Sequence, residues 1–273
     1  MTTVILDAAG SAKRHDSNAF AFLGPRAERF VLGAGFLLAL FIVWQLVTAL
    51  RIEPPILLPS PHEVIDAFGG LFSSSEIWPD FAASGKELLY GYLLAAAVGI
   101  SAGLAIGWYP RLGYFFDPFI SFLYAVPRVA LGPLLVVWLG IGLNSKVALV
   151  FLISVFPVLV NTSSGVRSLD QHLIRMARCF GASDLKIFRT IALPGSVPFI
   201  LGGLRLAIGQ ALIGVFVAEL LGAQHGIGAL IQNAGEQFQT DLMFAGLLIF
   251  AMAGMLLTAI LRGLERRFDA WRV

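Results

Sequence analysis

The chain has 273 residues, of which 58% are hydrophobic and only 13% are charged, and its mean hydropathy is +0.83. This composition excludes an ordinary soluble domain and predicts an integral membrane protein. The small net charge of +2 falls in separate basic clusters, which argues against a nucleic-acid partner, and the single cysteine, Cys179, excludes an intrachain disulfide.

The first predicted elements are a polar tail over residues 1–29 and an apolar run over residues 30–50. The run has 21 residues, which matches the roughly 20 that a helix needs to cross a bilayer. A cleaved signal peptide has a shorter apolar core nearer the N-terminus, so we interpret this run as a retained span. Residues 54–68 are proline-rich and then amphipathic, which predicts an outer loop followed by a short surface helix.

Five further apolar runs predict an all-α integral membrane protein with six transmembrane helices, in one transmembrane domain over residues 30–273. The third run contains Pro118, Pro127 and Pro133 and should be broken or kinked, because proline removes a helical hydrogen bond. Small residues recur at intervals of four in the second run and predict close contact with another helix. They are Gly91, Ala95, Gly99, Gly103 and Gly107. The six expected spans are residues 30–50, 88–108, 115–139, 145–163, 197–221 and 242–262.

The distribution of lysine and arginine predicts the orientation, because these residues are retained on the cytoplasmic side of a bilayer. Fourteen of them fall in the two tails and in the segments after the second and fourth spans, and three fall in the other connections. Both termini are therefore expected in the cytoplasm. The fourteen are Lys13, Arg14, Arg26, Arg29, Arg111, Arg167, Arg175, Arg178, Lys186, Arg189, Arg262, Arg266, Arg267 and Arg272, and the three are Arg51, Lys86 and Lys146.

Of the charged residues, Arg128 falls inside the third expected span, and Arg205 and Glu219 fall inside the fifth. Arg205 and Glu219 share one helix face but lie about 21 Å apart along the axis, so each needs another partner. Charges at this depth usually face a bundle interior or an aqueous cavity. We therefore take all three, with the polar Gln210, as candidates for a solute pathway. The alternative is that the charges snorkel, or pair between helices only for assembly.

A basic, amphipathic segment at residues 168–194 separates the fourth span from the fifth. Apolar residues recur at intervals of three and four over residues 169–180, which predicts a short helix. Gly181 can adopt the positive φ that ends such a helix, and Ser183 can cap a second one. Pro194 is expected to end the segment before the fifth span. We expect the two short helices to dock a partner on the cytoplasmic face.

The chain carries no sequence motif for ATP binding or catalysis. It has no GxxxxGK[ST] P-loop, and no carboxylate pair, GxSxG or HExxH falls in the spans, so we expect it not to be an enzyme. A self-contained carrier or channel, driven by an ion gradient through Arg128, Arg205 and Glu219, stays open as an alternative, but it would not need the short helices. A membrane anchor or assembly factor would not explain the charges inside the spans.

Residues 175–194 resemble the cytoplasmic loop of permease subunits of binding-protein-dependent ABC importers. That loop reads Glu-Ala-Ala, three residues, Gly, and about a dozen residues later Ile/Leu-x-Leu-Pro. It is matched here at Ala177, Gly181, Ile191, Leu193 and Pro194. Four other stretches resemble the branch of the family that serves nitrate, taurine and aliphatic sulfonates. They are LPSPHEV (58–64), AVPRVALGPLLVVWLGIG (125–142), FPVLVNTSSGVRSLD (156–170) and GGLRLAIGQALIGVFVAELLG (202–222).

The resemblance implies a subunit of the bacterial cytoplasmic membrane that works by alternating access and pairs with a second permease, as a homodimer. Two ATP-binding subunits would dock on the cytoplasmic side and carry ATP and Mg, so that this chain itself binds no cofactor, and an extracytoplasmic binding protein would deliver the solute. The family's coupling helix would then involve Arg175, Met176, Ala177, Phe180, Gly181, Ala182, Ser183, Phe188, Leu193 and Pro194. Arg175 stands where the family has glutamate, which implies an ATPase with matching acidic or neutral residues.

Overall fold

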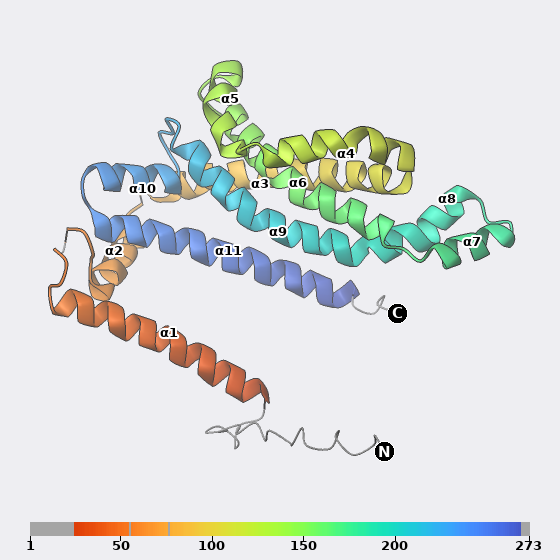
Figure 1. Cartoon of the computed structure of the whole chain (residues 1–273). Helices are drawn as coiled ribbons and strands as arrows, with labels where there is room; N and C mark the ends of the chain where they lie inside the picture. Colours follow the sequence, from red (N-terminus) through yellow and green to blue (C-terminus); the bar gives the residue numbers. More distant parts are fainter. Residues whose placement is uncertain (1–24, 55, 76, 269–273) are drawn as a thin grey trace, which may run out of the picture. The chain divides into compact units, whose positions relative to one another are not determined.

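The computed structural model describes residues 25–54, 56–75 and 77–268, and this described part consists of helices and the turns that join them (Figure 1). The chain divides into two compact units, one ending at Glu53 and one beginning at Pro54. The first unit contains α1 (Pro25–Ala49), whose residues 31–49 are long and apolar enough to cross a membrane. Most of the predicted polar tail, residues 1–24, lies outside the described residues.

The second unit is built around three long helices, α3 (Ile77–Trp108), α6 (Leu143–Arg167) and α9 (Leu193–Glu219). α6 packs along both α3 and α9, and α11 packs along α9 (Figure 1). The side chains buried between these helices are small or branched, such as Ala95, Val150 and Ala211. The other elements are α2 (Pro61–Ser73), α4 (Pro110–Ala125), η1 (Arg128–Leu131), α5 (Gly132–Leu139), α7 (Gln171–Cys179), α8 (Asp184–Ile187), η2 (Phe188–Ala192), α10 (Ile227–Glu236) and α11 (Thr240–Phe268).

The short helix predicted after the first span is present as α2, which begins with a capping box. Ser60 Oγ accepts a hydrogen bond from the N–H of Glu63 at 3.3 Å, and the Glu63 carboxylate accepts one from the N–H of Ser60 at 2.7 Å. These reciprocal bonds satisfy two backbone donors that a helix start leaves unpaired. The N–H of Ser60 stabilises the ionised carboxylate and so lowers the pKa of Glu63.

The predicted stripe of small residues on α3 is the surface on which α6 packs. A β-carbon added to Gly99 would lie 2.8 Å from Cβ of Val158, and one added to Gly103 would lie 2.7 Å from Cβ of Thr162. Protein interiors are densely packed, and two carbon atoms that are not bonded to each other cannot lie this close together. The glycines of this stripe have no side chains, so the backbones of α3 and α6 can lie close together. The prediction of close helix contact is confirmed.

We expect Gly99→Val to destabilise the protein by about 1–3 kcal/mol, because the new side chain forces α3 away from α6. Gly85→Val is the matched control on the same helix, since nothing lies within 4 Å of a β-carbon at Gly85. Thermal unfolding of the detergent-purified protein measures both changes. The packing account requires a lower melting temperature for Gly99→Val alone, and equal melting of the two variants would contradict it.

The break predicted in the third span is confirmed. α4 ends at Ala125, and the axis turns by 86° before it continues through η1 and α5. Pro127 stands directly before η1, and Pro133 lies in the first turn of α5, where its missing N–H is tolerated. Pro118 lies inside α4 without ending it. In the described part, five helices are long and apolar enough to cross a membrane, or six when the bent pair counts as one span.

Two helix boundaries differ from those predicted. α3 begins at Ile77 rather than near residue 88, because the polar turns before the apolar run are also helical and bond to neighbouring helices. The prediction that Pro194 ends the basic segment is wrong, because α8, η2 and α9 follow one another as a continuous helical stretch from Asp184 to Glu219. Pro194 occupies the first turn of α9, and the π-helical turn η2 before it accommodates the proline.

Candidate functional site

The basic segment between α6 and α9 forms a hairpin, in which α7 is a short helix as predicted and α8 continues through η2 into α9. Gly181 has a φ of 77°, in the left-handed region that favours glycine. The N–H of Gly181 donates to the carbonyl of Arg178 at 2.9 Å, and the N–H of Ala182 donates to that of Ala177 at 3.0 Å. These two bonds form the Schellman pattern, which ends α7 and reverses the chain.

Caps fix the starts of both helices in the α7–α8 hairpin. The Asp170 carboxylate accepts a bond from the N–H of His172 at 2.7 Å, and Ser183 Oγ accepts one from the N–H of Lys186 at 3.4 Å. Each cap satisfies a donor at a helix start. The predicted cap at Ser183 is therefore confirmed, and the sequence reading missed the one at Asp170.

The hairpin projects beyond the ends of the neighbouring helices (Figure 1). It presents apolar and basic side chains together. Phe180, beside the glycine turn, is 87% exposed, and Arg175 is exposed one turn before it. A large aromatic side chain in water is an anchor of the kind that protein interfaces bury. The exposed apolar residues are Leu173, Met176, Phe180 and Leu185, and the exposed basic residues are Arg175, Arg178, Lys186 and Arg189.

The ten predicted coupling residues all lie in or next to this hairpin, but they do not share one surface. Phe188 faces the bundle, where its ring packs edge-on against Trp108 of α3 with ring centroids 5.3 Å apart. Leu193 and Pro194 belong to the first turn of α9. The side chains that are exposed are Arg175, Met176, Phe180, Ser183 and Leu193, and those that are half-buried are Ala177, Ala182, Phe188 and Pro194.

Arg128 lies at the bend of the third span and bonds to α6. Its Nη1 donates to the carbonyl of Ile153 at 3.3 Å. Pro157, four residues further along α6, has no N–H to offer that carbonyl, so Arg128 supplies the missing donor. The guanidinium also lies over the rings of Tyr124 and Phe156, 5.0 and 5.4 Å from their centroids. The side chain is half-buried and thereby joins η1 to α6 beside the bend.

Arg205 and Gln210 both lie on α9 and both are half-buried. Arg205 forms an ion pair with Glu265 of α11, and the two side chains are about one third exposed. Among the described residues, nothing forms a hydrogen bond with its buried Nε. The pair joins α9 to the C-terminal part of α11.

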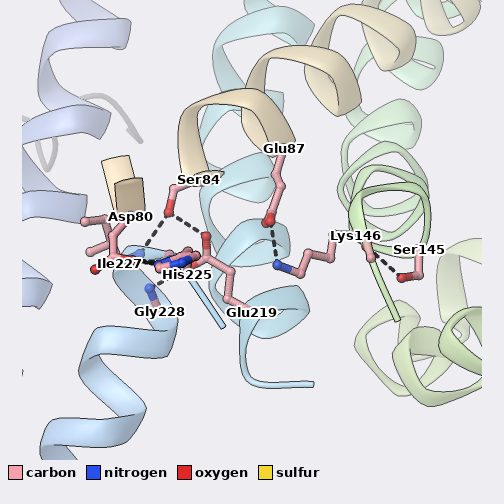
Figure 2. Close-up of polar contacts among 11 residues, drawn as sticks. Asp80, Ser84, Glu87, Ser145, Lys146, Glu219, His225, Ile227 and Gly228 are labelled. Atoms are coloured by element: carbon pink, nitrogen blue, oxygen red, sulfur yellow. Dashed lines mark hydrogen bonds and ion pairs between the residues drawn. The ribbon is translucent and has the colours of Figure 1, made fainter. Parts of the chain in front are cut away.

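Glu219 is fully buried at the end of α9 and holds the start of α10 (Figure 2). Its Oε1 accepts a bond from Ser84 Oγ of α3, and its Oε2 accepts one from the N–H of Gly228, both at 2.5 Å. Ser84 Oγ in turn accepts a bond from the N–H of Ile227 at 2.9 Å. A carboxylate at a helix start satisfies unpaired N–H groups and favours the positive end of the helix dipole.

Two further groups complete this buried cluster. Asp80 accepts a bond from the N–H of Gly226 at 3.0 Å and lies 3.2 Å from His225 Nδ1. Lys146 of α6 pairs with the buried Glu87 of α3 at 2.7 Å (Figure 2). Lys146 is predicted from the sequence to lie in a connection, because it flanks an apolar run. The only sequence signal of this cluster is the spacing of polar residues along one face before the second span.

The four pathway candidates are not brought together. Each of the three charged ones has its own partners, on α6 for Arg128, on α11 for Arg205, and on α3 and α10 for Glu219. For Glu219 and Arg205 these partners fit the alternative that the sequence left open, in which charges pair between helices. In the described part of the chain, no group of three or more His, Cys, Asp and Glu side chains is placed to hold a metal ion.

Comparison with known proteins gives a consistent result. Residues 95–271 match the family model described as binding-protein-dependent transport system inner membrane component. The chain is 35% identical to the taurine transport system permease protein TauC of Escherichia coli (strain K12), over 90% of this chain and 92% of that protein. It is 34% identical to the putative aliphatic sulfonates transport permease protein SsuC of Bacillus subtilis (strain 168), over 97% of each.

The fold is also similar to a solved structure. A chain of the MetNI methionine ABC transporter in an inward facing conformation aligns with a TM-score of 0.62 at 15% sequence identity, over 72% of this chain and 99% of that one. At this identity the likeness shows only the all-helical fold. Together with the family match, it establishes that the chain belongs to the inner membrane components of binding-protein-dependent transport systems, as a multi-pass ABC transporter permease and not an enzyme.

Proposed function

We propose that this chain is the transmembrane subunit of an ATP-driven importer. Two copies would form the pathway, two ATP-binding subunits carrying ATP and Mg would dock on the cytoplasmic side, and an extracytoplasmic binding protein would deliver the solute. The observation that carries the proposal is the α7–α8 hairpin, an exposed apolar and basic tip on a chain without a P-loop. Such a tip needs a partner, and family membership makes an ATP-binding subunit the expected one.

The proposed orientation places the hairpin and both termini in the cytoplasm of a bacterium. It is supported by the fourteen basic residues of the tails and of the segments after the second and fourth spans. In this orientation Phe180, Gly181 and their neighbours meet the ATP-binding subunit, while α10 and the buried Glu219 cluster lie at the outer end. Residues 30–273 would act as one transmembrane domain.

The proposed solute is taurine, an aliphatic sulfonate, nitrate or a related small anion. Two relatives that match over most of this chain are named for taurine and for aliphatic sulfonates. Arg128 at the bend provides a cation that an anion could meet in the pathway. The binding protein would determine most of the selectivity among solutes.

We expect the assembled transporter to work by alternating access, in which the pathway opens to one side of the membrane at a time. Closure of the ATP-binding subunits on ATP would move the hairpin and open the pathway toward the loaded binding protein. Hydrolysis would separate them and turn the pathway inward. This chain would form the pathway with its polar lining and would transmit the movement of the ATP-binding subunits. Its partners would bind and hydrolyse ATP.

Uptake by reconstituted vesicles tests the proposal. Vesicles that contain the permease with its ATP-binding subunit, and receive binding protein outside and ATP inside, should accumulate radiolabelled taurine or sulfonate. Vesicles with the permease alone should not. Uptake by the lone chain along an ion gradient without ATP would instead establish the carrier alternative.

We expect Arg128→Ala to lower uptake by about tenfold without loss of complex assembly, because it removes a pathway cation and frees the backbone at the bend. Arg128→Lys is the companion variant, since it keeps the charge but loses the guanidinium plane that lies over Tyr124 and Phe156. Initial uptake rates and size-exclusion profiles of the complex measure the two effects. Normal uptake by Arg128→Ala would remove this residue from the pathway.

A further inference from the structure

Two side-chain contacts flank the α7–α8 hairpin, one between the end of α6 and α4 and one between η2 and the end of α3. On one side, Arg167 ends α6 three residues before the cap of α7, and its guanidinium bonds to Asp117 of α4. On the other side, Phe188 follows α8 directly and packs against Trp108, the last residue of α3. α4 begins at Pro110, two residues after Trp108. Both ends of the hairpin are therefore held to the same corner of the bundle.

The contact between Arg167 and Asp117 has the geometry of a fixed link. Nη1 donates to Oδ2 at 3.0 Å and Nη2 donates to Oδ1 at 2.9 Å, so the fork is bidentate and sets the orientation of both side chains. The guanidinium also lies against the bare backbone of α4 one turn earlier, because a β-carbon on Gly113 would come within 2.7 Å of Nη2. No larger residue fits there without displacing the arginine.

The same contact contributes little to the stability of the fold. The two side chains are 43% and 45% exposed, and ion pairs with this exposure contribute at most about 1 kcal/mol. The specific effect of the pair is to fix α4 relative to the end of α6. A variant without this ion pair should therefore still fold, but its α4 would no longer be linked to the end of α6.

α4 connects this link with the bend of the third span. The helix runs from Pro110 to Ala125, and after the 86° turn Arg128 bonds to the carbonyl of Ile153. A displacement of the hairpin would pull on Asp117 in the middle of α4, and the bend lies at the C-terminal end of that helix. We propose that Arg167 and Asp117 are positioning residues that transmit hairpin movement through α4 to the broken span. This inference rests on the proposed function.

The test measures solute moved per ATP hydrolysed, in vesicles that contain the complete transporter. Arg167→Ala and Asp117→Ala are each expected to lower this ratio roughly three- to tenfold while ATP hydrolysis continues. The double reversal Arg167→Asp with Asp117→Arg is expected to restore most of it. Asp66→Ala is the matched control, because it removes an exposed carboxylate that pairs with His62 on α2. Its ratio should equal that of the wild-type protein.

A second measurement follows the transmission directly and uses only assembled complexes. Spin labels at Tyr114→Cys on α4 and Val137→Cys on α5, two sites that are each 80% exposed, report the distance across the bend in a Cys179→Ser background. ATP should change this distance when Arg167 is present and leave it unchanged in Arg167→Ala.

The outcomes separate the two proposals. A wild-type transporter without ATP-driven uptake refutes the proposed function itself. A coupled wild-type transporter whose single variants keep the normal ratio, or whose bend still responds to ATP in Arg167→Ala, overturns the role of the pair. A pairwise link would also be contradicted if the single variants lowered the ratio of solute moved to ATP hydrolysed and the double reversal did not restore it.

Discussion

Replacement of Gly181 by valine is expected to lower solute uptake tenfold or more while ATP hydrolysis by the assembled complex continues. The residue has a φ of 77° and closes the Schellman turn through its own N–H. A β-branched side chain in this region costs about 1–3 kcal/mol, and the chain avoids that cost by reshaping the turn. The reshaped turn displaces Phe180, the exposed aromatic residue beside it. Parallel measurements of uptake and phosphate release in the same vesicles check this result.

Gly181→Asn is the matched variant for this prediction. Asparagine tolerates the left-handed region far better than valine does, and nothing lies within 4 Å of a β-carbon at this position. We therefore expect Gly181→Asn to keep most of the coupling. If valine and asparagine lowered uptake equally, the backbone conformation of the turn would not be the cause. If Gly181→Val remained fully coupled, transmission would not depend on this turn.

Replacement of Glu219 by alanine is expected to destabilise the permease by about 3 kcal/mol. The change removes the acceptor of the Ser84 hydroxyl and of the Gly228 N–H, both of which are buried, and it leaves a cavity between α3, α9 and α10. The start of α10 then lacks one of its caps. Thermal unfolding in detergent measures the loss, and hydrogen exchange at the first turn of α10 shows whether it is local.

Two comparisons make the Glu219 prediction specific. Glu219→Gln keeps the size and one acceptor for the Gly228 N–H, but its NH₂ group cannot accept the bond from the Ser84 hydroxyl, so an intermediate loss is expected. Glu236→Gln changes an exposed carboxylate near the other end of α10 and should stay within about 0.5 kcal/mol of the wild-type protein. A loss at Glu236 as large as that at Glu219 would contradict the capping role.

The features that the sequence predicted correctly are those encoded within a few residues of one another. The glycine turn at Gly181 and the cap at Ser183 depend on local backbone bonds. The break at Pro127 depends on the proline ring itself. The small residues of α3 repeat every four positions and so mark one face of a single helix. Each of these signals can be read before any tertiary contact is known.

The contacts that the sequence could not predict join residues far apart in the chain. Ser84 meets Glu219 across 135 positions, and Arg167 meets Asp117 across 50. Such pairs depend on how the long helices lie against one another, and side-chain type alone does not indicate which charge meets which. The sequence predicts Glu219 as a pathway candidate from its charge and its place in a span, and it does not indicate that the donors to this carboxylate come from α3 and α10. Pro194 continues the helix for a related reason, since the π-helical turn before it has no signal in the sequence.

Cross-linking at Phe180 tests the central claim most directly, which is that the α7–α8 hairpin is the docking point of an ATP-binding subunit. Phe180→Cys and Phe238→Cys place single thiols at exposed sites, 87% and 66% exposed in the native residues, at the hairpin and between α10 and α11. Both are made in a Cys179→Ser background. With a short bifunctional reagent, Phe180→Cys should capture the ATP-binding subunit and Phe238→Cys should not. Capture through Phe238→Cys, with none through Phe180→Cys, would contradict both the docking site and the proposed orientation.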